Sequence, residues 1–315
     1  MIRILSKSVA DKIAAGEVVD RPLSVIKELV ENAVDAGADT VTVEIKNGGK
    51  TYLRVTDNGC GIPHEEAELA FLRHATSKIV SDRDLESIKT LGFRGEALAS
   101  IAAVSRTEMM TKIKESKVGT LLRLEGGEQT EVRSIGCPDG TTITVTDLFF
   151  NTPARLKFMK GEGTERTLII EFLSKAALAY PFVKFTVINN GNILFATNGN
   201  GDIYRNILAI YGNEIGKQLV PVEKHAEHGT IKGYVSNPAF SQNNRKNQIF
   251  FVNGRSIRSK VIEKGLDAAY TERLFNGRFP VAFLFLELPP ERLDVNIHPN
   301  KLEVRFDDEL AVYEL

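Results

Sequence analysis

The alternation of apolar and polar residues divides the first part of the chain into helices and strands. Residues 22–36 carry an apolar arc at helical spacing, and Pro22 suits the first turn of a helix. Residues 41–46 and 51–57 alternate with a period of two on either side of Asn47-Gly48-Gly49, which predicts a hairpin with one buried face. The same reasoning predicts helices at 64–73, 95–104 and 164–180, and strands at 107–113, 118–124, 141–147, 183–189 and 192–196.

A cluster of turn residues at 196–202 separates this part of the chain from a second set of elements. We therefore expect two domains, at 1–200 and 203–315. Residues 306–315 start like a helix and stop without a C-cap signal, which suggests a piece of a longer protein. In the second domain the pattern predicts helices at 203–211 and 256–272, and strands at 219–223, 229–236, 248–252 and 280–287.

Composition narrows the class of protein without indicating its function. A net charge of -1 and a hydrophobic content of 43% exclude a histone-like, acidic or disordered chain. Only two cysteines are present, which favours a reducing compartment. The N-terminus has no signal-peptide core, and the most apolar run, 281–286, is far short of a bilayer span of about 20 residues. We expect a soluble, cytoplasmic protein.

One window departs from this neutral balance. Residues 241–260 contain five basic residues and no acidic residue, around the apolar run 249–252. Such a cluster is typical of a surface that binds a phosphate backbone, although a solvated surface has the same composition.

Helix 22–36 holds the first candidate chemistry. Glu28 and Asn32 stand four residues apart and therefore project from one helix face. A carboxylate can take a proton from water, and an amide oxygen can complete the oxygen shell of Mg²⁺. The alternative is the ordinary polar face of a surface helix.

Two glycine-bearing turns hold further candidates. Asp57-Asn58-Gly59-Cys60-Gly61 follows a predicted strand, so a carboxylate could meet an exocyclic amine beside backbone that a flat base can approach. Residues 91–98 run from a glycine-bearing loop into a helix, which is a common phosphate site. Taken singly, the first is also an ordinary Asn-Gly turn and the second a helix start that happens to contain glycine. Neither a P-loop nor a Rossmann glycine motif occurs.

The order of these three motifs resembles the ATPase superfamily named for gyrase, the heat-shock chaperone, histidine kinases and MutL. The amino-acid sequences around these motifs are similar to those of the MutL family of DNA mismatch repair proteins, and the similar segments span nearly the whole chain. They are IAAGEVVDRP (13–22), VIKELVENAVDAGA (25–38), DNGCGI (57–62), RHATSKI (73–79), LGFRGEAL (91–98), DLFFNTPARLKF (147–158), FVNGR (251–255) and DVNIHPNKLEVRF (294–306).

The resemblance implies catalytic roles for two residues. Glu28 would be the general base for the attacking water, while Asn32 would hold Mg²⁺ against the triphosphate of ATP. Lys301, from the second domain, would reach the γ-phosphate and so report whether that phosphate is present.

The resemblance also implies how the base would be recognised. Asp57 would accept a hydrogen bond from the adenine amino group, helped by Thr141 through a water molecule. The alternation of Thr141 with Ile143 and Val145 favours Thr141 over Thr142 as the residue that faces the site.

Residues 73–92 would form a lid over the nucleotide, with Thr76, Ser77 and Lys78 at its base. The remaining nucleotide contacts implied by the resemblance are Gly61, Ile62, Leu91, Gly92, Phe93, Arg94, Gly95, Glu96, Ala97 and Leu98.

In the basic window the resemblance makes Arg255, Arg258 and Lys260 the preferred DNA contacts, with Arg245 and Lys246 as further candidates. An arginine is common in the family where Lys260 stands, so the charge is kept but a bidentate grip on phosphate would be lost.

The implied fold class is α/β. A two-layer α/β sandwich of the Bergerat ATPase type would be followed by a smaller βαβ-type, ribosomal-protein-like domain. The arm before Arg21 would cross to a partner in an ATP-dependent homodimer. The implied partners are DNA, the mismatch-recognition protein MutS and a downstream nuclease or helicase, at the bacterial nucleoid. A C-terminal dimerisation region, which in some members is an endonuclease, is not encoded in this sequence.

Two alternatives share the same nucleotide site. The chain could be a nucleotide-gated binding module in which hydrolysis hardly matters, but such a module would need no base at Glu28. It could also be the ATPase domain of a type II topoisomerase, which should lack the segments 151–155 and 298–301.

Overall fold

The chain divides into two compact units, each built around its own sheet. The first comprises residues 1–174 and 182–201, and the second residues 175–181 and 202–315. The structure is a computed structural model that describes residues 7–78, 95–294 and 304–315.

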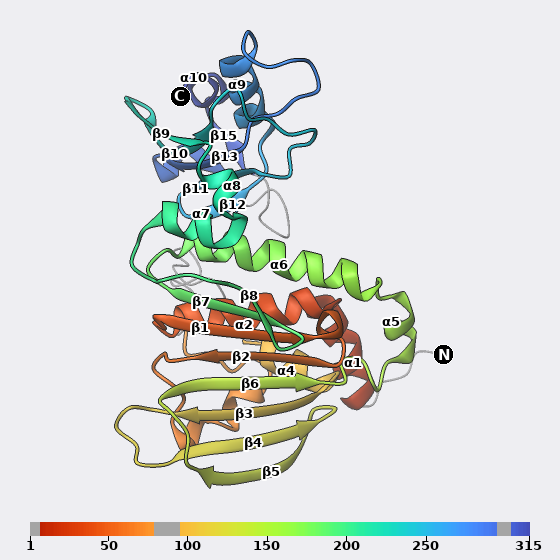
Figure 1. Cartoon of the computed structure of the whole chain (residues 1–315). Helices are drawn as coiled ribbons and strands as arrows, with labels where there is room; N and C mark the ends of the chain where they lie inside the picture. The colour runs from red at the N-terminus through yellow and green to blue at the C-terminus, as the bar shows by residue number, and fades with distance from the viewer. Residues whose placement is uncertain (1–6, 79–94, 295–303) are drawn as a thin grey trace. The chain divides into compact units, whose positions relative to one another are not determined.

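The first unit contains an eight-stranded mixed sheet with the order β5-β4-β3-β6-β2-β1-β7-β8 (Figure 1). Neighbouring strands are antiparallel except for the parallel pair β1 and β7. The predicted hairpin is confirmed as β1 and β2. The strands are β1 (Thr40–Lys46), β2 (Tyr52–Asp57), β3 (Arg106–Lys112), β4 (Gly119–Glu125), β5 (Glu128–Ile135), β6 (Gly140–Thr146), β7 (Lys184–Asn189) and β8 (Asn192–Ala196).

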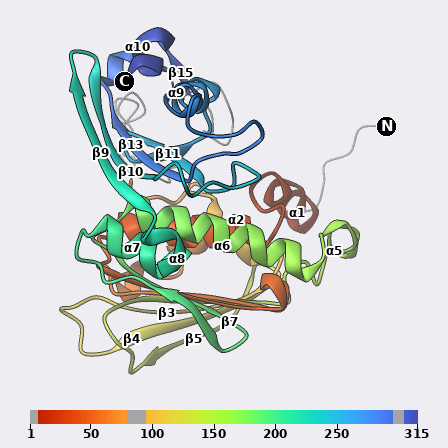
Figure 2. The same cartoon turned by 45° about the horizontal axis from the view of Figure 1, so that its top comes forward.

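Helices cover one face of this sheet, as Figures 1 and 2 show. The fully buried side chains of Val41, Val43 and Ile45 on β1 face this layer, in which α2 contacts β1 and buries its own Ile26. Pro22 begins α2, at a position that needs no backbone hydrogen bond. The first unit is therefore the expected two-layer α/β sandwich. Its helices are α1 (Lys7–Val18), α2 (Pro22–Asp35), α4 (Ala97–Ala103), α5 (Pro153–Phe158) and α6 (Glu162–Ala179), with a 3₁₀ turn η1 (Asn47–Gly49).

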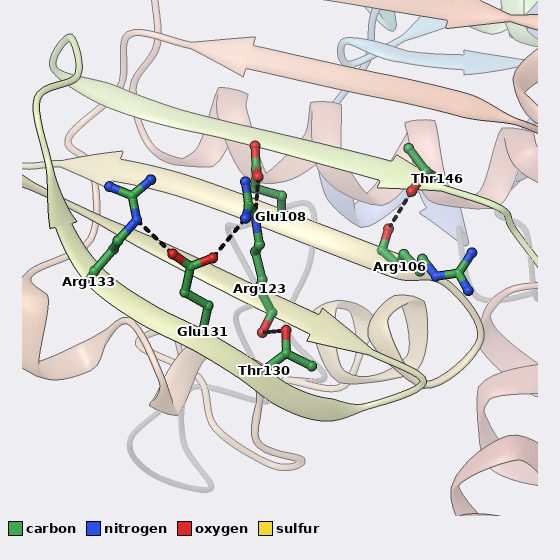
Figure 3. A network of polar contacts seen from close by, with 7 residues as sticks. All are labelled: Arg106, Glu108, Arg123, Thr130, Glu131, Arg133 and Thr146. Carbon is green, nitrogen blue, oxygen red and sulfur yellow. Dashed lines mark hydrogen bonds and ion pairs between the residues drawn. The ribbon is translucent and has the colours of Figure 1, made fainter.

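The opposite face of the sheet is polar and carries cross-strand ion pairs (Figure 3). Arg123 on β4 pairs with Glu108 on β3 at 2.6 Å and with Glu131 on β5 at 2.7 Å, and Arg133 also pairs with Glu131 at 2.7 Å. Strand β5 was not predicted, because few of its residues are apolar. The positive-φ turn at 126–127 and these charge pairs hold it at the sheet edge.

The predicted helix at 64–73 is wrong. The segment forms two separate 3₁₀ turns, η2 (His64–Glu66) and η3 (Leu69–Phe71). Only Ala67 and Phe71 are buried, while Leu69 and Leu72 are about half exposed. Because so little apolar surface is buried, tertiary packing does not support a continuous helix here.

The second unit contains a five-stranded sheet with the order β12-β11-β13-β10-β9. Strands β11 and β13 are parallel, and α9 connects them, so the expected βαβ arrangement is confirmed. The elements are α7 (Ile203–Tyr211), α8 (Asn213–Gly216), β9 (Leu219–Ala226), β10 (Gly229–Ser236), β11 (Gln248–Val252), β12 (Arg255–Ile257), α9 (Lys260–Tyr270), β13 (Ala282–Glu287), η4 (Pro290–Arg292), β14 (Leu293–Asp294), β15 (Arg305–Phe306) and α10 (Glu309–Glu314).

In this second sheet the strands β11 and β13 are buried on both faces. On one face Phe251 and Phe283 pack with Leu178, which lies in the last turn of α6. On the other face Phe250 and Leu284 pack with residues of α9. Burial on both sides explains why β11 and β13 are continuous apolar runs instead of alternating ones.

The predicted helix at 256–272 begins later than expected, at Lys260. Asn253 and Gly254 have positive φ angles of 47° and 78°, and this tight turn folds β12 back against β11. An Asn-Gly pair between two strands is a strong hairpin signal, so the error came from applying the helical period to the residues that follow it. No helix among the described residues combines the length and apolar content that a bilayer crossing requires.

Candidate functional site

Helix α2 carries the predicted base and the predicted Mg²⁺ ligand on one side. Its apolar residues Leu29 and Ala33 are at most 3% exposed and lie on the side that packs against β1 and β2. Glu28 and Asn32 are one turn apart and half-buried on a different side. Burial of the apolar arc therefore sets the direction of both polar side chains.

The ammonium group of Lys78 lies over the same side of α2. Its Nζ donates to Oδ1 of Asn32 at 2.9 Å and forms an ion pair with Oδ2 of Asp35 at 2.6 Å. The Asp35 side chain is only 9% exposed. These two oxygens therefore already hold a cation between them. Asp35 was assigned no role in the sequence analysis.

Asp57 ends β2 on the helix-covered face of the sheet. Its Oδ1 accepts hydrogen bonds from the backbone N–H of Gly59 at 2.8 Å and of Thr141 at 3.3 Å. Burial raises the pKa of the Asp57 carboxyl, and the two hydrogen bonds oppose this shift. Both acceptor contacts that the described residues make with this carboxylate use Oδ1, so Oδ2 remains for a ligand.

The turn that follows Asp57 is held tightly on three sides. Oδ1 of Asn58 accepts from the backbone N–H of Thr40 at 2.9 Å. Gly59 lies against Ala36, where a Cβ would come within 2.8 Å of the Ala36 carbonyl oxygen. Gly61 has a φ of 71°, and a Cβ there would clash with the backbone of β3. Both glycines are therefore required by close backbone approach.

The two threonines at the start of β6 face opposite sides of the sheet. Thr141 is paired with Asp57 across the ladder and shares its face with buried Ile143. Thr142 instead donates to Oγ1 of Thr56 at 3.2 Å on the other face. The structure thus places Thr141, and not Thr142, beside Asp57.

Thr111 on β3, which the sequence analysis did not identify, contacts Thr141 of the Asp57–Thr141 pair. Its Oγ1 is 3.0 Å from Oγ1 of Thr141 and accepts from the N–H of Ile62 at 2.8 Å. Its side chain is 1% exposed. Thr111 lies opposite Thr141 in the neighbouring strand. Both strands were predicted, but the sequence does not show that they are neighbours, so this pairing could not be predicted.

The base of the predicted lid meets the start of α4. Gly95, with a φ of 61°, lies against the backbone of Ala75, and a Cβ would come within 2.7 Å of the Ala75 carbonyl oxygen. His74 lies 3.2 Å from Glu96. Thr76 Oγ1 accepts from the N–H of Lys78 at 3.1 Å. Residues 74–75 and 95–96, which flank the undescribed part of the lid, are therefore close together.

Several predicted site residues lie outside the described residues. They are the lid segment 79–92, which includes Leu91 and Gly92, the adjoining Phe93 and Arg94, and Lys301.

The N-terminal arm was predicted to cross to a partner subunit. In this chain α1 packs against α4 of its own unit. Asp11 pairs with Arg73 at 3.1 Å, and Arg155 donates to the carbonyl oxygen of Lys12 at 3.0 Å. Gly16 leaves room for the Arg155 guanidinium, where a Cβ would clash.

In the second unit the residues predicted to contact DNA differ in whether their side chains are already paired within the protein. Arg245 forms a bidentate ion pair with Asp267, with N–O distances of 2.8 and 2.5 Å, and its guanidinium stacks on the ring of Phe279. The pKa of Arg245 is raised by its hydrogen bond to Asp267. Arg245 is therefore held within the protein by an acid that lies outside the basic window.

The preferred candidates lie at the sheet edge and the adjoining helix start. Arg255 is half-buried on β12, while Arg258 and Lys260 are exposed. Among the residues that the structure describes, none of these three forms an ion pair. Lys246 is exposed as well, though it has an interaction partner.

Comparison with known protein families gives two matches, one in each half of the chain. Residues 17–148 match the family described as histidine kinase-, DNA gyrase B-, and HSP90-like ATPase. Residues 207–315 match the family described as DNA mismatch repair protein, C-terminal domain.

Curated relatives include the DNA mismatch repair protein MutL of Agathobacter rectalis, 45% identical over 99% of this chain and 48% of that protein. MutL of Caldanaerobacter subterraneus is 46% identical over 99% of this chain and 53% of that protein. This chain thus spans about half the length of the curated relatives it matches.

Solved structures agree with this assignment. The N-terminal domain of a DNA repair protein has a TM-score of 0.80 at 29% identity, over 96% of this chain and 94% of that one. The Aquifex aeolicus MutL ATPase domain complexed with ADP has a TM-score of 0.65 at 31% identity, over 87% of this chain and 94% of that one. The chain therefore belongs to the MutL family of DNA mismatch repair proteins.

Proposed function

We propose that this chain binds and slowly hydrolyses ATP with Mg²⁺, and that the nucleotide state switches a DNA mismatch repair protein between open and dimeric, DNA-clamping forms. The observation that carries this proposal is the pairing of Asp57 with Thr141, next to a turn in which the N–H of Cys60 donates to the carbonyl oxygen of Ala36 at the end of α2. Asp57 and Thr141 supply an acceptor and a hydroxyl for a base, and α2 supplies the carboxylate base and the amide ligand.

Adenine recognition would use the free oxygen of Asp57. Because Oδ1 already accepts two backbone N–H groups, Oδ2 can accept from the exocyclic amine of adenine. Thr141 would serve the neighbouring ring nitrogen, directly or through water. Gly61 and Ile62 would border the base, since the tight turn leaves their backbone beside Asp57.

The residues on α2 fit a metal cation. Oxygens of Asn32 and Asp35 hold the Lys78 ammonium group between them, and Mg²⁺ prefers such oxygen ligands. No cluster of three or more His, Cys, Asp or Glu side chains that could hold a metal occurs within the described ranges. Asn32 would therefore hold Mg²⁺ together with the nucleotide phosphates, and Mg²⁺ would neutralise phosphate charge. Lys78 would leave Asn32 for the phosphates.

Glu28 would act as the general base that takes a proton from the attacking water. We expect Glu28→Ala to retain ATP binding and to reduce turnover by about 100-fold or more, as is typical when a general base is removed. Glu31→Ala, on the same helix, is the matched control and should keep turnover. Phosphate release and equilibrium ATP titration measure the two quantities. Unchanged turnover in Glu28→Ala would favour the nucleotide-gated binding module, and no ATP binding by the wild-type protein would refute the function.

The remaining parts of the switch rest on family membership. Residues 73–92 would close over the nucleotide, residues 91–98 would bind its phosphates, and Lys301 would contact the γ-phosphate. The arm before Arg21 would leave α4 and cross to a second subunit when ATP binds. Arg255, Arg258 and Lys260 would contact the DNA backbone with little sequence specificity. MutS and a downstream nuclease or helicase would be the protein partners, in the bacterial cytoplasm.

A further inference from the structure

The segment that follows α9 in the second unit presents an aromatic ring to solvent. The side chain of Phe275 is 89% exposed, whereas the nearby Leu274 and Phe279 are partly buried. A single exposed apolar residue needs no explanation by itself, because most protein surfaces carry some. Phe275 is distinguished by the charge of the surface in which it lies.

Phe275 belongs to a tight turn that is bonded to the basic window. The backbone N–H of Arg278 donates to the carbonyl oxygen of Phe275 at 3.0 Å, and Gly277 between them has a φ of 77°. The guanidinium of Arg278 donates to Oγ of Ser241 at 3.0 Å and also contacts Oδ1 of Asn243. These acceptors are neutral, so they orient the guanidinium without neutralising its charge.

Helix α9 connects this turn to the predicted DNA contacts. The helix begins at Lys260, next to Arg258, and ends at Tyr270. Its exposed residues at four-residue spacing are Lys260, Lys264 and Ala268, so they form one stripe along the helix. The buried residues of α9 lie on the opposite side. We call the exposed residues Lys260, Lys264 and Ala268 the α9 stripe.

The surface formed by residues 241–279, all of which the structure describes, is strongly basic. Glu272 is its one exposed acidic residue, since Glu263 and Asp267 are half-buried and Asp267 is paired with Arg245. The exposed basic residues of the same segment are Lys246, Arg258, Lys260, Lys264, Arg273 and Arg278. Such an excess of positive charge suits the phosphate backbone of a nucleic acid.

The length of α9 matches a short stretch of one DNA strand. Its 11 residues span about 16 Å at the usual helical rise. Phosphates of a stacked strand are about 3.4 Å apart, so about five nucleotides cover this distance. A strand held at Arg258 can therefore follow the α9 stripe and reach the turn at Phe275.

An aromatic ring at the end of a basic track suits an unpaired base. In a duplex the faces of the bases are stacked on one another, whereas an unpaired base can stack on an exposed ring. A protein partner would instead favour several apolar residues together. The exposed neighbours of Phe275 in the turn are Arg273, Asn276 and Arg278, which are polar or charged.

We propose that the α9 stripe and the turn at 275–278 extend the DNA site of the second unit, and that Phe275 stacks on an unpaired base there. The inference rests on the proposed DNA binding by this unit. The basic residues hold the backbone, and Phe275 adds a preference for single-stranded over duplex DNA.

The first test uses fluorescence, because the chain contains no tryptophan. Phe275→Trp introduces a single indole whose emission is quenched when a base stacks on it. We expect saturable quenching by oligo(dT), and none by an abasic strand of the same length, which keeps the phosphates without the bases. Phe158→Trp is the matched control: Phe158 is also 89% exposed but lies in the first unit, and its replacement should show no quenching.

The second test compares Kd values for oligo(dT) and for a duplex of the same length. Phe275→Ala should raise the Kd for oligo(dT) at least about fivefold, the lower limit for stacking of one base on an aromatic ring, and should change the duplex Kd less than about twofold. The salt dependence should stay unchanged, because no cation is removed. Lys264→Gln should instead reduce the slope of log Kd against log salt for oligo(dT) by about 0.7, the value for one phosphate contact.

Several outcomes would overturn the inference. They are wild-type affinity of Phe275→Ala for oligo(dT), equal quenching of Phe275→Trp by the abasic strand or by the duplex, and equal quenching of Phe158→Trp. Because Phe275 is 89% exposed, its replacement should leave Tm unchanged, so lost binding would not reflect unfolding. Weaker DNA binding by Arg258→Glu with unchanged binding by Phe275→Ala would overturn this inference alone. Absence of DNA binding by the wild-type protein would overturn the proposed DNA binding as well.

Discussion

The substitution Asp57→Asn separates the function of this carboxylate from its effect on stability. Oδ1 of Asp57 accepts from the N–H groups of Gly59 and Thr141. An asparagine keeps both bonds only if its own oxygen takes that place, since the reverse orientation would set an NH₂ group against two N–H donors. The NH₂ group is therefore directed to the position of Oδ2, where adenine would present its own amino group.

The expected loss of affinity follows from that geometry. A hydrogen bond to a charged group contributes about 1.5–3 kcal/mol, and leaving a desolvated donor without an acceptor costs about 1–3 kcal/mol more. Because about 1.4 kcal/mol corresponds to a factor of ten, ATP affinity should fall by about 60-fold or more.

The expected effect on stability has the opposite sign. Burial raises the pKa of Asp57, so the folded state disfavours its ionised form. Ionised Asp57 therefore costs stability at neutral pH, and the cost is relieved as pH falls through the folded-state pKa. Removing the charge should leave the nucleotide-free protein as stable as wild type or more stable.

Calorimetric titration with ATP and Mg²⁺, together with thermal unfolding without nucleotide, measures both effects. Glu128→Gln is the control: this carboxylate is exposed on the edge strand β5, so the loss of its charge should change neither affinity nor Tm. Wild-type ATP affinity in Asp57→Asn would refute the adenine assignment. A Tm lowered by several degrees would refute the account of its hydrogen bonds.

Three further predictions follow from the same contacts. ATP affinity should fall on acidification, because protonation of Asp57 removes the acceptor for the adenine amino group. Since the pKa of Asp57 is raised, the fall should begin at a higher pH than an exposed aspartate would give. ATP titrations across a pH series should show this dependence, and Asp57→Asn should abolish it. Lys78→Met should lower the free energy of unfolding by about 1–3 kcal/mol without nucleotide, since the nearly buried Asp35 loses its hydrogen-bonded ion pair with Lys78, and an unchanged urea midpoint would contradict this. Arg258→Glu should weaken DNA binding and flatten its salt dependence, because Arg258 is exposed. Arg245→Gln should mainly reduce stability, because Arg245 is paired with Asp267 within the protein. Wild-type DNA binding by Arg258→Glu would show that the basic residues around it are solvated and do not contact DNA.

The periodicity of apolar residues was sufficient to predict the helices and strands that bury only one face. Helix α2 and the β1–β2 hairpin follow from period and turn chemistry alone, because one face of each is buried. Strand β5 was missed because few of its residues are apolar, although its Glu131 lies only eight residues from its cross-strand partner Arg123. Strand β12 was missed although the turn at Asn253 signalled it.

The same distinction applies to the candidate site. Glu28 and Asn32 are related by helical spacing, and Thr141 could be preferred to Thr142 by strand alternation. The hydrogen bonds of Thr111 could not be anticipated, because they depend on which strands are neighbours and on how closely the turn after β2 approaches β3. Nor could the contact of Lys78 with α2, which joins residues over 40 positions apart.

The last turn of α6 has a consequence for how the two units can be separated. Residues 175–181 belong to the second unit although they precede the last strands of the first. Leu178 is fully buried in the second unit's core, and Nδ2 of Asn206 donates to the carbonyl oxygen of Ala177 at 3.1 Å. A protein started at residue 202 would expose that core and leave Asn206 without its acceptor. Conversely, a protease cut at 197–201 should leave two fragments that stay associated, because the first fragment supplies part of the second unit.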